Sequence, residues 1–228
     1  MSVVAMPSGK LLVAALAAAA CAAGCAADSP PHVSGHACVV FDLRIPDECG
    51  AMQPVGGLSI VEVESQRTAT TDDAGLFDLT LPDSGTSAVL RIGDDSNWRP
   101  SIVGVPELPA EDVLAPVITS TLWGTYVAAL HAPDDPTMAA VHVSFKRPGE
   151  YVATADVAGA AQLLYNQGAP FDWKPTPPGD QTVDFIAFGV PIGNGTAHVT
   201  IHSQSDTTLF DGDVPVAPAA ITWLHVGP

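Results

Sequence analysis

Short runs of alternating apolar and polar residues constrain this fold more than any other feature of the sequence. Alternation is typical of a strand with one buried face. Glycine, proline, asparagine and aspartate separate the runs at intervals of roughly ten residues, which favours an antiparallel sandwich. Long helices are not indicated beyond residue 25, because β-branched residues and Gly124 reduce the most helix-like segment, 111–130, to one or two turns. The sequence therefore predicts an all-β fold. The expected strands are 38–43, 58–64, 76–81, 87–92, 139–145, 151–157, 160–166, 182–188, 196–202 and 220–226.

A proline-rich segment divides these strands into two groups. Residues 98–118 contain Pro100, Pro106, Pro109 and Pro116 with little periodicity, and we interpret them as a linker. This places one sandwich at 37–97 and a second at 119–228.

The two groups share an internal similarity. The segments ATTDDAGLFDL (69–79) and ATADVAGAAQL (153–163) agree at six of eleven positions. A repeat of related sandwich units explains this agreement, and chance similarity between two Ala-rich turns is the alternative.

The N-terminus has the features of an export signal. Lys10 precedes the apolar run LLVAALAAAA, and the small residues of CAAGC follow it. This order is typical of a secretory signal, and the apolar run is too short to span a bilayer comfortably. We predict that residues 1–24 are a signal peptide.

The motif Ala-Ala-Gly-Cys that ends at Cys25 resembles a bacterial lipoprotein signal, in which the cysteine becomes lipidated. Cys21 is a rival site, but Gly24 directly precedes Cys25, which lies nearer the polar residues of an expected flexible tether, 25–36. The resemblance implies an exported protein held to a membrane by its lipid, and Ala26 resembles outer-membrane sorting. Ordinary cleavage near Ala27 is the alternative and would give a soluble periplasmic or secreted protein.

Charge limits the classes of partner. The chain has 25 acidic and 8 basic residues, a net charge of −17. Such a surface repels phosphate backbones, so nucleic acid is not expected as a partner.

Two cysteines, Cys38 and Cys49, follow the lipoprotein motif. An exported chain meets an oxidising compartment, which favours a disulfide between them. A metal site would require more cysteines or a histidine at ligand spacing.

The first group of strands resembles a known family. The segments VVFD (39–42), PVGGLSIVEV (54–63) and TATTDDAGLFDLTLP (68–82) are similar to the signature of the carboxypeptidase regulatory-like domain. The resemblance covers roughly residues 37–95 and implies a transthyretin-like β-sandwich. Domains of this family are accessory modules without catalytic residues. The resemblance therefore implies a binding or scaffolding role.

The Asp-Gly turn within that signature is expected to be structural. Thr71 and Asp72 should accept hydrogen bonds from backbone amides, and Gly75 should take an angle that a side chain forbids. Phe77 and Leu79 should fill the core.

No motif in the sequence predicts catalytic residues, a cofactor or a metal. The Asp72–Asp73 pair lacks the ordered oxygen ligands of a calcium loop. His198 and His202 lie about 13 Å apart along a strand, too far to share one metal. The nucleophile elbow, the Walker motif and the dinucleotide fingerprint are all missing from the sequence.

Two tryptophans in expected loops, Trp98 and Trp173, are candidate ligand-binding residues. Exposed indole rings could stack on sugars, or they could plug the ends of each sandwich. The function predicted from the sequence is that of a non-catalytic lipoprotein that binds a protein or glycan at the bacterial surface. The alternatives are a carbohydrate-binding module and a secreted enzyme of unknown type.

Overall fold

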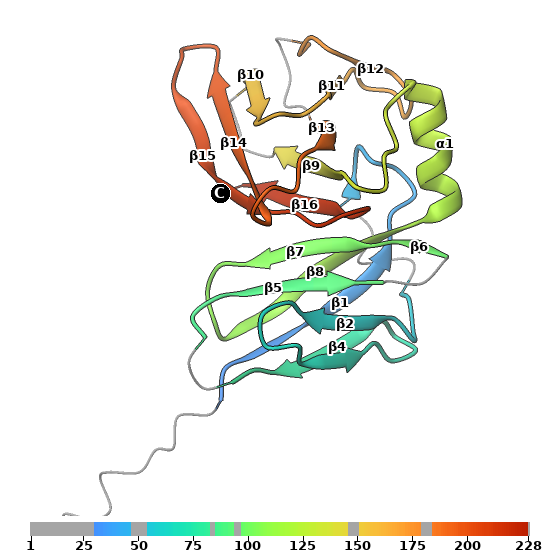
Figure 1. Ribbon diagram of the computed structural model, residues 1–228, viewed down its shortest axis with the longest axis vertical. Helices are drawn as coiled ribbons and strands as arrows, with labels where there is room; N and C mark the ends of the chain where they lie inside the picture. Colours follow the sequence, from blue (N-terminus) through green and yellow to red (C-terminus); the bar gives the residue numbers. More distant parts are fainter. Residues whose placement is uncertain are drawn as a thin grey trace, which may run out of the picture. The chain divides into compact units, whose positions relative to one another are not determined.

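Strands dominate the described part of the chain and lie in three sheets (Figure 1). The strand order is β4-β1-β8-β6 in the first sheet, β12-β11-β13-β9-β16-β7-β5-β2-β3 in the second and β10-β14-β15 in the third. The all-β sandwich fold predicted from alternation is confirmed. This computed structural model describes residues 30–46, 54–82, 85–93, 97–145, 151–178 and 184–227.

The strands are as follows. The first sheet contains β1 (His32–Val39), β4 (Leu76–Thr80), β6 (Trp98–Arg99) and β8 (Ala110–Thr119). The second contains β2 (Ser59–Glu62), β3 (Thr68–Thr70), β5 (Ala88–Ile92), β7 (Ser101–Val105), β9 (Ala139–Phe145), β11 (Gln162–Asn166), β12 (Trp173–Lys174), β13 (Phe185–Val190) and β16 (Ile221–Val226). The third contains β10 (Val152–Val157), β14 (Thr196–Ser203) and β15 (Thr208–Pro215).

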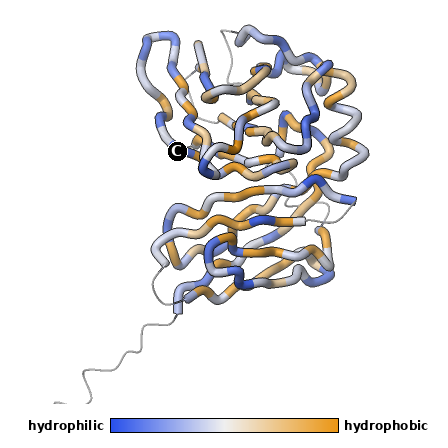
Figure 2. The backbone as a smooth tube through the Cα atoms, in the orientation of Figure 1, coloured by the Kyte–Doolittle hydropathy of each residue, from blue (hydrophilic) through white to orange (hydrophobic). Residues whose placement is uncertain are grey.

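Two hydrophobic cores lie against the second sheet. The first core joins side chains of β1, β4 and β8 to side chains of β2, β5 and β7. The second joins side chains of β10, β14 and β15 to side chains of β9 and β13. In β13, Ile186 and Phe188 belong to the first core, whereas Phe185 and Ala187 belong to the second. Both faces of β13 are therefore buried, which explains its nearly continuous apolar sequence (Figure 2).

The two sandwiches share one continuous sheet, because β7 of the first pairs with β16 of the second. Residues Pro31–Pro228 form one unit by their contacts. The prediction of a linker at 98–118 is wrong: the segment contains β6, β7 and most of β8. The strands of this segment complete the first sandwich, with β7 beside β5 and β8 beside β1.

The prolines of this segment explain why its strands are not evident from the sequence. Pro100 and Pro106 lie just outside β7, and Pro109 just precedes β8. Pro116 lies inside β8, a strand whose second edge pairs only at Ile118 and Thr119, with β6. Proline is tolerated on such an edge, because its missing N–H need not join a ladder.

Three strand pairs are parallel, although antiparallel sheets were expected. These pairs are β1 with β8, β7 with β16, and β9 with β16. Parallel neighbours need long crossover connections, and here whole strands of other sheets intervene in the chain.

The expected tether at 25–36 is shorter than predicted, because β1 begins at His32. The alternating burial of His32–Val39 shows why: the segment pairs with β4 and β8. Cys38 is buried in β1. Its expected partner Cys49 lies outside the described residues, as do Cys21, Cys25 and the predicted signal peptide, so these predictions stand untested.

One helix, α1 (Ser120–Leu130), is longer than the one or two turns expected. The side-chain oxygen of Thr119 accepts a hydrogen bond from the Leu122 amide and caps its N-terminus. The helix buries Trp123, Tyr126 and Leu130, while Gly124 faces open space.

No helix in the described residues is long and apolar enough to cross a membrane.

Candidate binding groove

The turn before β4 has the structural role expected from the sequence. The side chain of Asp72 accepts hydrogen bonds from the amides of Ala74 and Leu76, each at 2.9 Å. The Thr71 hydroxyl accepts from the Leu58 amide at 2.9 Å and donates to the Val55 carbonyl. Both side chains therefore bond the backbone around the turn that connects β3, in the second sheet, to β4, in the first.

The tryptophans expected in loops are in short strands instead. Trp173, in β12, is buried with 7% of its surface exposed, and its indole N–H donates to the Pro170 carbonyl at 2.8 Å. Trp98, in β6, is half-buried and packs against the first core. Both rings contribute to packing, which was the alternative to stacking on sugars, and a ligand-binding role for either ring stays a prediction.

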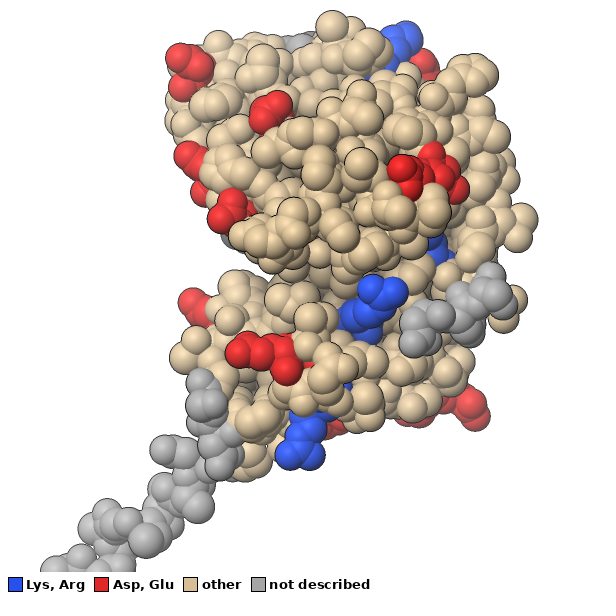
Figure 3. All heavy atoms as spheres, in the orientation of Figure 1, with Lys and Arg blue, Asp and Glu red and all other residues tan. Residues whose placement is uncertain are grey.

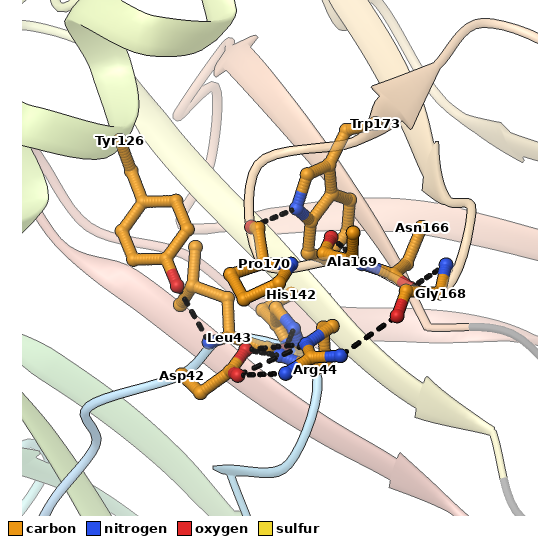
Figure 4. Close-up of polar contacts among 10 residues, drawn as sticks. All are labelled: Asp42, Leu43, Arg44, Tyr126, His142, Asn166, Gly168, Ala169, Pro170 and Trp173. Carbon is orange, nitrogen blue, oxygen red and sulfur yellow. Dashed lines mark hydrogen bonds and ion pairs between the residues drawn. The ribbon is translucent and has the colours of Figure 1, made fainter.

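The loop that follows β1 is held against the second half of the chain (Figure 4). Leu43 is fully buried; its amide donates to the Tyr126 hydroxyl at 3.3 Å, and its carbonyl accepts from Nε2 of His142 at 2.6 Å. A carbonyl can only accept, so Nε2 of His142 carries a proton. Burial raises the pKa of Tyr126 above its usual value, so the phenol is neutral.

Arg44 completes this contact. Its guanidinium binds the carboxylate of Asp42 and donates to the Gly168 carbonyl at 2.8 Å. Partial burial raises the pKa of Asp42, but the hydrogen bonds and charge of Arg44 together hold it below its usual value. The loop Asp42–Arg44 is thus a structural clamp rather than an open reactive site.

Histidine and aspartate side chains meet on the third sheet. His198 of β14 lies with Nδ1 2.9 Å from Asp213 and Nε2 3.0 Å from Asp211, both in β15. The hydrogen bond that His198 donates to Asp213 and the charges of both carboxylates raise the pKa of His198. Among the described residues, no group of three or more histidine, cysteine or acidic side chains could hold a metal ion.

A groove of about 820 Å³ lies where the shared sheet divides. The pairing of β7 with β16 ends at Val103 and Trp223, although β7 continues to Val105 and β16 to Val226. In Figure 3, which has the orientation of Figure 1, the notch at the left lies at the level of β7 and β16. The residues that line the groove are Pro46, Ser87, Ala88, Val89, Val103, Gly104, Val105, Pro106, Val113, Leu114, Pro116, His142, Ser144, Phe210, Asp213, Val214, Pro215, Thr222, Trp223, Leu224 and His225.

The lining is mostly apolar and is held in place by two hydrogen bonds. The indole N–H of Trp223 donates to the Ser101 hydroxyl at 3.0 Å, across the junction of β16 and β7. The hydroxyl of Thr222 donates to the Pro215 carbonyl of β15. An apolar concavity of this volume, with a few fixed polar groups, is typical of ligand pockets.

This groove is not evident from the sequence. Most of its residues come from β5, β7, β8, β9, β15 and β16, and three of these strands, β7, β8 and β15, were not predicted from the sequence. The short apolar run Ile102, Val103 and Val105 was the available signal, but the neighbouring prolines obscured it.

No protein-family model and no curated protein matches the chain. Among solved structures, the shaft pilin spaA from Lactobacillus rhamnosus GG is 12% identical, with 88% of this chain and 98% of that chain covered and a TM-score of 0.26. A DUF3823 family protein from Bacteroides ovatus ATCC 8483 is 10% identical, with coverages of 82% and 97% and a TM-score of 0.27. In a type II cohesin–X-dockerin complex from Acetivibrio cellulolyticus, the match is 18% identical, with 39% of this chain and 56% of that chain covered and a TM-score of 0.28.

Proposed function

We propose that this protein is a non-catalytic β-sandwich module that binds another molecule in the groove between β7 and β16. The observation that carries the proposal is the groove itself: about 820 Å³, largely apolar and held by the Trp223–Ser101 hydrogen bond. The sequence signature at 37–95 supports a carboxypeptidase regulatory-like first sandwich, a kind of module that contributes contacts rather than chemistry.

Gly104 offers a direct test of the groove. It is exposed in β7, and a Cβ at this position would lie 3.8 Å from the Pro215 ring, an ordinary contact. Gly104→Leu should therefore fill the groove without backbone strain. Gly124→Leu is the matched control, because Gly124 is also exposed and faces open space on α1.

The measurement is the fluorescence of Nile red, a neutral dye that brightens in apolar sites. The wild-type protein and Gly124→Leu should enhance the dye equally, and Gly104→Leu should lose most of the enhancement. Circular dichroism confirms that both variants are folded. Equal enhancement by all three proteins would contradict binding in the groove.

We further propose that the protein is exported and tethered to a membrane, with outer-membrane sorting, through a lipid on Cys25. The support is the sequence alone, because Cys25 lies outside the described residues. Mass spectrometry of the native N-terminus tests this: a diacylglyceryl mass on Cys25 is expected. A free amine near Ala27 would show a soluble protein instead, and a lipid on Cys21 would move the site.

A further inference from the structure

We propose that the groove binds an extended peptide segment, apolar in its centre and flanked by lysine or arginine, which pairs with the open edge of β15. This inference rests on the proposed binding function of the groove and names the class of partner. Three observations carry it: an unpaired strand edge, an apolar lining and an acidic rim.

The first observation is the open edge of β15. Thr208–Pro215 pairs with β14 on one side, and no described strand pairs with its other side. That second side faces the groove, because Pro215 lies against Gly104 of β7 and accepts the hydroxyl of Thr222 of β16. An unpaired strand edge presents amides and carbonyls that an added strand can satisfy.

The strand β8 also borders the groove, but it is the poorer edge for pairing. Pro116 supplies no amide there, and Asp112 has a φ of +57°, which interrupts the extended backbone. The pairing of β15 with β14 shifts register only between Ile201 and His202, and β15 has no proline before Pro215. Of these two strands, β15 therefore offers the better edge for pairing with a peptide.

The second observation is the lining beside that edge. Val103, Val105, Leu114, Trp223 and Leu224 border the groove. In an extended peptide, alternate side chains point to one face. A segment of alternating β-branched residues would bury one row of side chains on this apolar lining while its backbone pairs with β15.

The third observation is charge. None of the described residues that line the groove is lysine or arginine, and Asp213 lies on its rim. Asp211 lies two residues away on the same strand, and both carboxylates are more than half exposed. Acidic side chains also outnumber basic ones on the face drawn in Figure 3. This arrangement favours a cationic flank on the peptide and disfavours an anionic one.

The test uses the full chain without its signal and a defined probe, the blocked peptide Lys-Val-Thr-Val-Thr-Val-Lys, in isothermal titration calorimetry. The peptide should bind the wild-type protein and Gly124→Leu alike, and Gly104→Leu should bind at least about tenfold more weakly. Replacing both lysines of the peptide by glutamate should weaken binding by about tenfold as well. Asp213→Asn should reduce the difference between the two peptides, whereas Asp78→Asn, at an exposed site in β4, should not.

Two N-methylated peptides test the pairing itself. Methyl groups on the three valine amides block one edge of the peptide, and methyl groups on the two threonine amides block the other. Pairing with β15 predicts that only one of the two analogues loses binding. Equal binding by both would show contact through side chains alone and would overturn the inference.

Hydrogen exchange locates the pairing. The amides of β15 should exchange more slowly when the peptide binds, while those of β10, the opposite edge of the same sheet, should not change.

If Nile red binds in the groove but the peptide does not, the groove remains a binding site and the peptide inference is wrong. Self-association of the wild-type chain that Gly104→Leu abolishes would assign the groove to a second copy and would also overturn the inference.

Discussion

At the turn before β4, the backbone determines which residue can be present. Gly75 has a φ of +75°, and an added Cβ would lie 2.5 Å from the carbonyl oxygen of Ala37. Gly57 has a similar φ of +79°, but an added Cβ there would meet no atom within 4 Å. Alanine substitutions at the two glycines can therefore separate two free-energy costs, that of a left-handed backbone and that of a steric clash.

We predict that Gly57→Ala lowers the free energy of unfolding by about 1–2 kcal/mol, the cost of a side chain in the left-handed region. Gly75→Ala should lose about 1–3 kcal/mol more, because its Cβ also meets the Ala37 carbonyl oxygen and the His36 ring. Urea denaturation measures both values. Equal losses in the two variants would show that the contact with Ala37 has no energetic consequence.

His198 gives a prediction about pH. Its raised pKa means that the protonated imidazole is favoured in the folded state, beside Asp213 and Asp211. The stabilisation is fully present below the unfolded pKa of about 6.5 and is lost as the pH rises through the higher folded value. Titration by NMR should therefore give a His198 pKa above about 6.5. Asp213→Asn should lower this pKa and Asp78→Asn should leave it unchanged; an unmoved value in Asp213→Asn would contradict the assigned cause.

At the scale of elements, the clamp formed by Asp42–Arg44 connects distant parts of the chain. Its backbone is held by Tyr126 of α1 and His142 of β9. The Tyr126 ring also contacts Phe171, with the ring centroids 4.8 Å apart. The side chains of Tyr126 and His142 and the carbonyl of Gly168 therefore fix this loop from three separate segments of the chain.

We predict that Tyr126→Phe lowers the free energy of unfolding by about 1–3 kcal/mol, because the buried Leu43 amide loses its acceptor. Tyr151→Phe is the control, since Tyr151 is exposed and should change stability little. Both are measured by chemical denaturation. A Tyr126→Phe variant as stable as Tyr151→Phe would show that the Leu43 amide finds another partner.

The sequence predicts elements well where local alternation sets them. The run 139–145 is strand β9 as predicted, and 76–81 and 220–226 differ from β4 and β16 by one residue. β15 was not predicted, because Asp211, Gly212 and Asp213 break its apolar pattern and are typical of a turn. Its strand structure depends on pairing with β14, which no local pattern reports.

At the scale of the whole molecule, the groove depends on contacts that sequence cannot supply. It exists because β7 and β16, more than a hundred residues apart, pair in parallel at Ser101–Val103 and then separate. Trp98 and Trp173 were expected in loops but lie in the short strands β6 and β12, and their burial depends on tertiary packing. Local alternation therefore predicts the strands, while the pairing of strands that are distant in the chain determines the groove.

The shared sheet also determines how the molecule should unfold. Leu90 belongs to the first core and Ile201 to the second, and both are fully buried. Because β7 and β16 join the two sandwiches, loss of one core exposes the edge of the other, and we expect one cooperative transition. Leu90→Ala and Ile201→Ala should each lower the free energy of unfolding of that one transition by about 2–5 kcal/mol. Tryptophan fluorescence and far-UV circular dichroism should report the same midpoint in each variant; two separate transitions in either one would mean that the sandwiches unfold independently.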